Sequence, residues 1–233
     1  MMDEGDAGPV HGVALVERVI EVVRRDPGAS VLPYRDVPWV EEGVASPMDE
    51  GLLAKAVFPS GHPLSPSLRA WLAFDTSLLE RHRWFTPDGG FAPRPLDQLV
   101  GEEMGAPWAG EFTWLAERFD ECFLLPGGSD SRRILAVTEP DVEGEYPVLA
   151  LDFDDLPFLG LMYPGFDVYL ADTVNLLGRG DPRDYTELID HQIYGHRMRG
   201  HASHCFAGDV CVEFPFESTP VYAQLRSRPD EAG

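Results

Sequence analysis

The first part of the chain has a hydrophobic pattern that predicts a helix. Between Val10 and Arg25, apolar residues recur at spacings of three and four positions, with charged residues between them: Val13, Val16, Val19, Ile20 and Val23. That spacing is typical of an amphipathic helix. Because β-branched residues have a modest helix propensity, burial of the valine face has to stabilise it, and Pro27-Gly28 provides a stop. We expect this face to pack in the core rather than on a membrane or a partner.

A second helix is predicted over Pro63 to Leu79. Ser65 suits the N-cap and Pro66 the first helical position, and one stripe then carries Leu68, Trp71, Leu72, Leu78 and Leu79. Trp71 could line a ligand pocket, but a large aromatic residue at helical spacing more often belongs to the core. A third helix is indicated by Phe112, Leu115, Ala116 and Phe119.

Short apolar runs from Cys122 onward predict a sheet. Pro126-Gly127-Gly128 ends the run Cys122 to Leu125, and the next two strands are separated by an acidic turn, Glu139 to Glu145. The strand-like runs are Ile134–Val137, Tyr146–Leu151, Phe158–Tyr163 and Phe166–Leu170, and Asp172 is expected to cap a helix through Leu177. The pattern favours an α+β fold with a single mixed or antiparallel sheet flanked by helices.

The remaining residues predict little regular structure. A short helix is indicated by Tyr185, Leu188, Ile189 and Ile193, and we expect Gly195 and Gly200 to interrupt it. Val210 to Phe214 predicts a late edge strand, and the polar stretch 217–233 a partly disordered tail. We expect residues 1–233 to form a single domain.

The formal net charge is −22, with 18 Lys and Arg residues against 40 Asp and Glu residues. Such a charge repels nucleic-acid phosphates and anionic lipids and speeds encounter with a basic protein, although it also serves solubility alone. Three cysteines fit a reducing compartment better than a disulfide framework. The acidic N-terminus is unlike a signal peptide, and no apolar run has the length of a membrane helix. We expect a cytoplasmic protein.

Two patterns suggest chemistry without completing it. Asp152-x-Asp154 after an apolar strand resembles the opening motif of haloacid-dehalogenase-type phosphatases, but no Thr follows it and Lys55, the single lysine, lies upstream. Potential metal ligands gather near the C-terminus without a zinc-site spacing: His191, His196, His201, His204, Cys205 and Cys211. Nucleotide-binding and serine-elbow motifs are absent from the sequence. We therefore expect no catalytic site, metal or cofactor.

The predicted helix Pro63–Leu79 and the strand-rich stretch Phe123 to Leu177, FLLPGGSDSRRILAVTEPDVEGEYPVLALDFDDLPFLGLMYPGFDVYLADTVNLL, together resemble the SMI1/KNR4 (SUKH) superfamily. The resemblance covers a core of about residues 52–177. It implies an α+β fold and a noncatalytic protein-binding role, and many bacterial members are immunity proteins that neutralise toxins. The leading hypothesis is an immunity protein that binds a cognate toxin. The alternatives are an intracellular regulatory adaptor of the same fold and, less favoured, a Mg-dependent phosphatase.

The same hypothesis suggests where a basic toxin would bind. Carboxylates on exposed turns would attract it, and the candidates are Asp141, Glu143, Glu145, Asp154 and Asp155.

Overall fold

The computed structural model describes residues 11–27, 39–40, 43–127, 131–152, 157–179, 185–219 and 222–224. Its helices are α1 (Gly12–Arg25), α2 (Glu50–Leu53), α3 (Pro66–Leu72), α4 (Ser77–Glu80), α5 (Leu96–Met104), α6 (Ala106–Ala116), α7 (Phe166–Thr173) and α8 (Gly195–Cys205), with the short 3-10 helices η2 (Glu187–Asp190) and η3 (Phe216–Ser218). Its strands are β1 (Cys122–Leu125), β2 (Ser131–Ala136), β3 (Val148–Asp152), β4 (Phe158–Tyr163) and β5 (Cys211–Glu213).

The strands form one antiparallel sheet in the order β1-β2-β3-β4-β5. Residues on neighbouring strands that face each other are apolar at the centre, as in the pairs Ile134 with Leu149 and Leu149 with Leu161. The late edge strand predicted from Val210 to Phe214 is present as β5. The α+β fold with a single sheet flanked by helices is confirmed.

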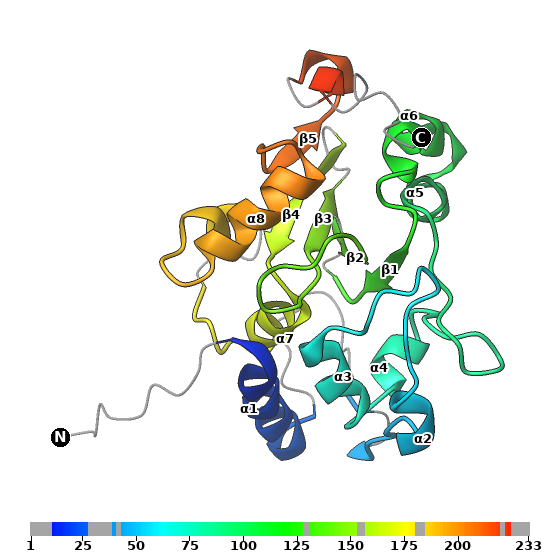
Figure 1. The fold of residues 1–233 in the computed structure, drawn as a ribbon, viewed down its shortest axis with the longest axis vertical. Helices are drawn as coiled ribbons and strands as arrows, with labels where there is room; N and C mark the ends of the chain where they lie inside the picture. The colour runs from blue at the N-terminus through cyan, green and yellow to red at the C-terminus, as the bar shows by residue number, and fades with distance from the viewer. Residues whose placement is uncertain are drawn as a thin grey trace.

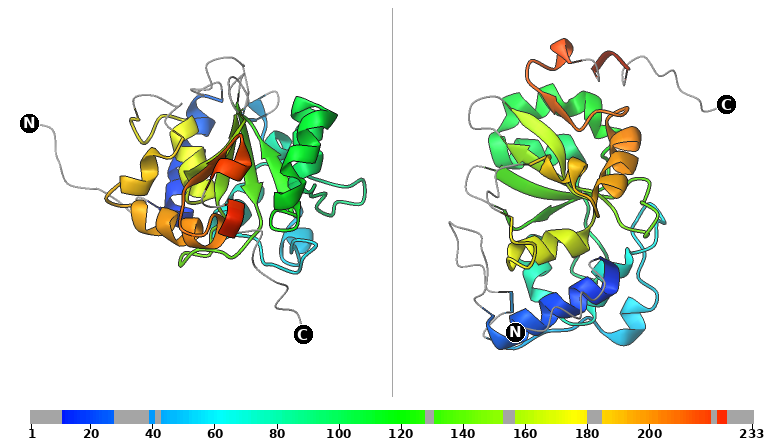
Figure 2. Two further views of the ribbon diagram at one scale, coloured as in Figure 1. Left: turned by 90° about the horizontal axis from the view of Figure 1, so that it is seen from above. Right: turned by 90° about the vertical axis from the view of Figure 1, so that its left-hand side faces the viewer.

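Helices lie on both sides of the sheet (Figure 2): α5 and α6 on one side, α7 and α8 on the other. Because both faces are covered, consecutive strand residues are buried, and the residues of β3 from Val148 to Leu151 are inaccessible. The helices α1 and α3 pack against α7 beyond the end of the sheet (Figure 1). One hydrophobic cluster contains buried residues from Leu15 in α1 to Phe216 in η3.

The predicted helices are present where an apolar stripe or a cap indicates them, with starts that differ by a few residues. In α1 the buried face consists of Leu15, Val16, Val19, Ile20 and Val23, but Val13, which the pattern placed on that face, is 40% exposed. The hydroxyl of Ser65 accepts a hydrogen bond from the Leu68 N–H, as expected of an N-cap. Trp71 is a core residue, fully buried with its ring edge-on to Trp39 at 5.5 Å.

The predicted helix Pro63–Leu79 is wrong in its length, because it divides into α3 and α4. Asp75 lies between them, and its carboxylate accepts hydrogen bonds from the Ser77 hydroxyl and the Leu78 N–H at the start of α4. It also accepts the Ser46 N–H, 2.9 Å away. This carboxylate binds backbone and side-chain donors that a continuous helix would not present to it.

Two predictions near the C-terminus are also wrong. The apolar run Phe166–Leu170 is the helix α7 rather than a strand, and Asp172 lies inside it, where it accepts a hydrogen bond from the Tyr163 hydroxyl at 2.7 Å. Gly195 and Gly200 do not interrupt a helix but belong to α8. Residues 220–221 and 225–233 of the predicted tail lie outside the described residues. None of the described helices has the length and apolar character that crossing a bilayer requires.

Candidate functional site

The acidic turn before β3 differs from the expected partner-binding surface. Glu143 is exposed, but the side chain of Asp141 is 2% exposed and Glu145 is fully buried. The expectation of exposure is therefore wrong for these two residues. Asp141 Oδ1 accepts the N–H groups of Glu143 and Glu145, which folds the turn around the carboxylate. Asp154 and Asp155 lie outside the described residues.

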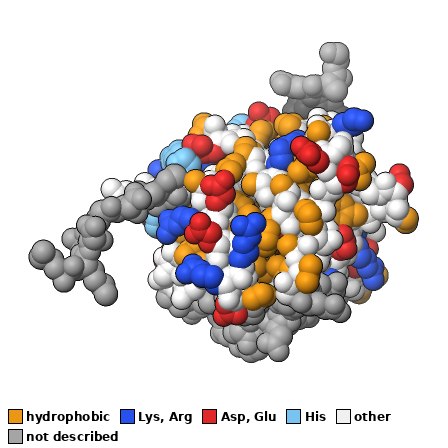
Figure 3. Space-filling view, turned by 90° about the horizontal axis from the view of Figure 1, so that it is seen from below, with side chains coloured by type: hydrophobic (Ala, Val, Ile, Leu, Met, Phe, Trp, Pro, Cys, Tyr) orange, Lys and Arg blue, Asp and Glu red, His pale blue; other side chains and the backbone are white. Residues whose placement is uncertain are grey.

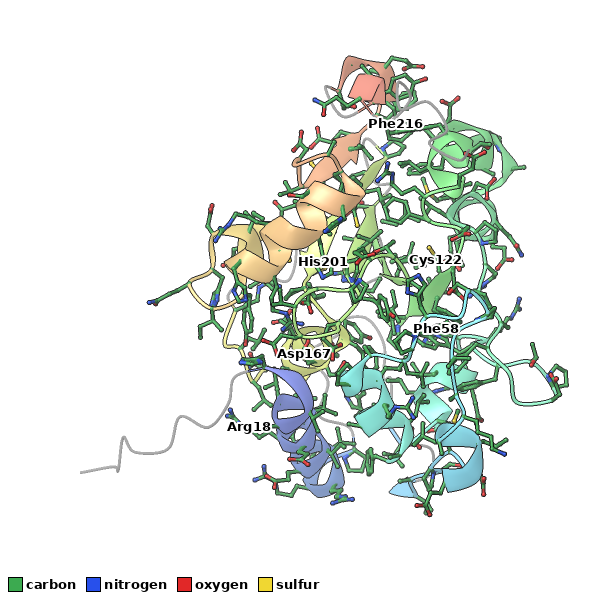
Figure 4. The ribbon with its side chains drawn as sticks, viewed as in Figure 1. Arg18, Phe58, Cys122, Asp167, His201 and Phe216 are labelled. Carbon is green, nitrogen blue, oxygen red and sulfur yellow. The ribbon has the colours of Figure 1, made fainter. Side chains whose placement is uncertain are left out.

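Asp141 and Glu145 belong to a buried ionic cluster, which we define as Asp141, Glu145, Asp167, Arg197 and His201. The two Nη atoms of Arg197 bind the Asp167 carboxylate at 3.1 and 3.3 Å, and its Nε binds Asp141. Asp167 also accepts the Gly12 N–H at the start of α1, 2.7 Å away. The cluster joins α1, α7, α8 and the acidic turn, and Figure 4 shows Asp167 and His201 on facing elements.

The pKa values in the cluster are shifted in opposite directions. Burial alone would raise the pKa of Asp141, but hydrogen bonding to His201 and the Arg197 ion pair lower it to about 2. Burial, reinforced by repulsion from Asp167, raises the pKa of Glu145 to about 7. Because the side chains of Arg197 and Asp167 are 1% and 0% exposed, a substrate has no access to them. The cluster is a structural feature of the fold.

Neither of the two patterns that suggested chemistry forms a complete site among the described residues. Asp152, at the end of β3, accepts a hydrogen bond from the Tyr185 hydroxyl, and the Asp154 of the phosphatase-like motif lies outside the described residues. His201 Nε2 donates to the Pro164 carbonyl at 3.0 Å, and Cys205 is buried beside Thr138. Within the described ranges, no three His, Cys, Asp or Glu side chains are grouped so that they could hold a metal ion.

A surface pocket at the end of the molecule away from α1 was not predicted from the sequence (Figure 1). It has a volume of about 300 Å³ and lies between α6, η3 and the segment 222–224. We call it the acidic aromatic pocket and define it by Glu111, Trp114, Phe216, Glu217 and Tyr222. The Trp114 ring lies 5.7 Å from the Phe216 ring and 4.8 Å from the Tyr222 ring, and both glutamates are exposed. Phe216 marks this end in Figure 4.

Aromatic faces beside carboxylates form an environment for a cation. An ammonium or guanidinium group gains attraction from the ring quadrupoles and from the negative charges, while its aliphatic stem packs on the rings. The volume is at the lower end of the range for ligand pockets, about 300–1,000 Å³, and suits one long side chain better than a cofactor. The end of the molecule away from this pocket differs in its distribution of charge. Figure 3 shows positive and negative side chains interspersed among apolar ones on that face, which is seen from below.

This pocket cannot be recognised in the sequence because its parts are distant along the chain. Glu111 and Trp114 are three positions apart on α6, and Phe216 and Glu217 follow a hundred residues later. The available signal was the exposed side of α6, where a tryptophan and a glutamate share one face at helical spacing.

No protein-family model matches this sequence, and no curated protein is significantly similar to it. Among solved structures, a crystal structure of an uncharacterized protein from Salmonella enterica subsp. enterica serovar typhimurium str. 14028s is similar, with a TM-score of 0.53 and 15% sequence identity. The similarity covers 91% of this chain and 98% of that chain. At this identity the likeness concerns the fold alone.

Proposed function

We propose that this protein is a noncatalytic immunity protein that binds and neutralises a basic protein toxin in the cytoplasm. The acidic aromatic pocket carries the proposal, because it offers a cation site on a chain whose formal net charge is −22. The resemblance to the SMI1/KNR4 superfamily supports the immunity role, and the negative charge disfavours nucleic acid as the partner.

In this proposal, recognition has two stages. The overall negative charge steers a basic partner during encounter, an effect that salt screens over a Debye length of about 10 Å at 0.1 M. One Arg or Lys side chain of the partner then enters the acidic aromatic pocket, where it lies between Glu111 and Glu217 and against the Trp114 ring. Contacts of this kind at the centre of an interface contribute most of the binding energy.

The direct test is identification and neutralisation of a partner. The tagged protein is expressed in the organism that encodes it, captured partners are identified by mass spectrometry, and each basic partner is then expressed alone in a bacterial host. We expect one partner to arrest growth, and co-expression of this protein to restore it. A stoichiometric basic partner that leaves growth unaffected would instead favour the regulatory adaptor, and an acidic partner would contradict the proposal.

Neutralising the two glutamates of the pocket tests whether it is the binding site. We expect Glu111→Gln with Glu217→Gln to raise the Kd for the partner about tenfold or more, because two charges next to the bound cation are lost. The matched control is Glu21→Gln with Glu50→Gln, two exposed residues of α1 and α2 with the same change in net charge. Surface plasmon resonance at two salt concentrations measures both variants. Equal effects of the two double substitutions would show that net charge, and not the pocket, determines affinity.

A further inference from the structure

A second pocket has the opposite charge to the rest of the molecule. It has a volume of about 490 Å³ and lies between the segment after α4, helix α5 and the strands β1 and β2. We call it the arginine pocket and define it by its charged walls: Arg81, Arg83, Arg94, Arg132, Glu102 and Glu103. Among the described lining residues, four guanidinium groups against two carboxylates leave a formal excess of two positive charges. In a chain with a net charge of −22, such a concentration requires an explanation.

Three of the arginines are held in place by the surrounding structure. The backbone of Arg94 pairs with Cys122 in β1, its Nη1 binds Glu102 at 2.7 Å, and its Nη2 binds the His82 carbonyl at 3.2 Å. Arg132 binds Glu103 through Nε, and Arg81 binds the Ser77 carbonyl at 3.2 Å. Because each guanidinium has its N–H donors in a fixed fork, these contacts fix the direction in which each group faces.

Arg94 also has a buried donor without an acceptor. Its Nε is inaccessible to solvent and has no hydrogen-bond partner among the residues that the structure describes. Buried unpaired donors are rare in folded proteins, and each one needs a physical explanation, such as a missing ligand. The Nη atoms of Arg94, which bind Glu102 and the His82 carbonyl, each carry a second N–H that an oxygen of a ligand in the pocket would accept.

Arg83 stands where the backbone favours glycine. Its φ is 60°, in the left-handed region, and the flanking hydrogen bonds run from its N–H to the Glu80 carbonyl and from the Trp84 N–H to the Leu79 carbonyl. These two bonds form the Schellman motif that ends α4, in which this position is most often glycine. The side chain is exposed and forms no hydrogen bond or ion pair with the described residues. An arginine here strains the backbone, and it is attracted electrostatically to Glu102 without forming an ion pair with it.

We propose that the arginine pocket binds a small organic dianion through two or more guanidinium groups, with a phosphate monoester or a dicarboxylate as the ligand. The fork of N–H donors matches the oxygen spacing of both anions, and a dianion balances the excess of two positive charges. Leu124 and Leu125 add an apolar wall for the organic part. Since the overall negative charge repels anions, a ligand has to contact several arginines at once to bind. This site is independent of the proposed toxin-binding role.

Isothermal titration calorimetry with inorganic phosphate and with succinate, at constant ionic strength set with chloride, tests the proposal on the full chain. We expect the wild-type protein to bind at least one of them with a Kd below about 1 mM, and Arg83→Gln to weaken that binding about tenfold. Tighter binding of phosphate or of succinate identifies which oxyanion the site prefers. No binding of either anion up to about 10 mM would overturn the proposal.

Two further variants separate the pocket from net charge and from folding. Arg18→Gln removes an exposed arginine of α1, on the other side of the molecule in Figure 4, and is expected to leave binding unchanged. Arg83→Gly relieves the left-handed strain, so its melting temperature should equal or exceed that of the wild type while binding falls as in Arg83→Gln. Equal weakening by Arg18→Gln, or full binding by Arg83→Gly, would overturn the assignment.

Discussion

Replacing Arg197 with methionine is expected to lower the free energy of unfolding by about 3–5 kcal/mol, because it leaves buried carboxylates without their counter-ion. Arg197 is the shared partner of Asp141 and Asp167, whose side chains are 2% and 0% exposed. Methionine fills a similar volume, so the loss reports the unpaired charges rather than a cavity. Urea denaturation at neutral pH measures it, and an unchanged m-value would show that the comparison is valid.

Arg199→Met, on the exposed side of the same helix, is the matched control. Arg199 donates one hydrogen bond to the Ile189 carbonyl at 2.8 Å, and its replacement should cost less than about 1 kcal/mol. Adding Asp141→Asn to Arg197→Met should recover part of the loss, since it removes one uncompensated charge. A loss below about 1 kcal/mol for Arg197→Met would show that water or rearrangement solvates the carboxylates.

The sequence predicts the parts of this fold that local patterns specify. The valine stripe of α1, the Ser65 cap and the apolar runs of β3 and β4 each contain their signal within a few residues. The segment Phe166–Leu170 does not, because a short apolar run suits a buried strand or a buried helix equally. Its helical state is fixed by tertiary contacts, among them the bond of Asp167 to α1 and its ion pair with Arg197.

The candidate sites could not be predicted in the same way, because they depend on distant residues. Asp141 and Arg197 are 56 positions apart, so an acidic turn that looks solvated in the sequence is folded inward around a buried arginine. The helix α8 also depends on distant residues. It contains Gly195 and Gly200, and its Arg197 and His201 bind Asp167 and the Pro164 carbonyl. Only Glu143, of the described carboxylates expected to face a partner, is on the surface.

The stability of the protein should decrease as the pH rises toward neutrality, and Glu145 should be a cause. The pKa of Glu145 is raised from 4.5 to about 7 by burial and by repulsion from Asp167. A group whose pKa is raised on folding gives its full stability below the unfolded pKa, and that stability is lost as the pH rises through the folded pKa. A difference of this size corresponds to about 3 kcal/mol between the two limits.

Glu145→Gln is expected to remove this pH dependence. The amide keeps an acceptor for the Ser67 N–H, which lies 2.8 Å from Oε1 in the wild type, and it can donate to the Ser67 hydroxyl. Because it never ionises, the variant should be more stable than the wild type at about pH 8 and should approach it as the pH falls. Denaturation should be measured from about pH 5.5 upward, because the solubility of the protein is lowest near its isoelectric point. Between about pH 5.5 and pH 8, the unfolding free energies of the variant and the wild type should diverge by about 2 kcal/mol.

Glu143→Gln is the control, two positions earlier in the same turn and exposed. It removes the same charge without a buried environment, so its stability should follow the wild-type pH profile. Asp141 affects the opposite end of the scale: its pKa of about 2 is depressed, so the stability that it contributes is present above its unfolded value of 3.8 and is lost as the pH falls toward 2. The profile of Glu145→Gln should therefore flatten on the neutral side alone. Parallel profiles for Glu145→Gln and the wild type would mean that Glu145 stays ionised in the folded protein, with its charge compensated by the donors of Ser67.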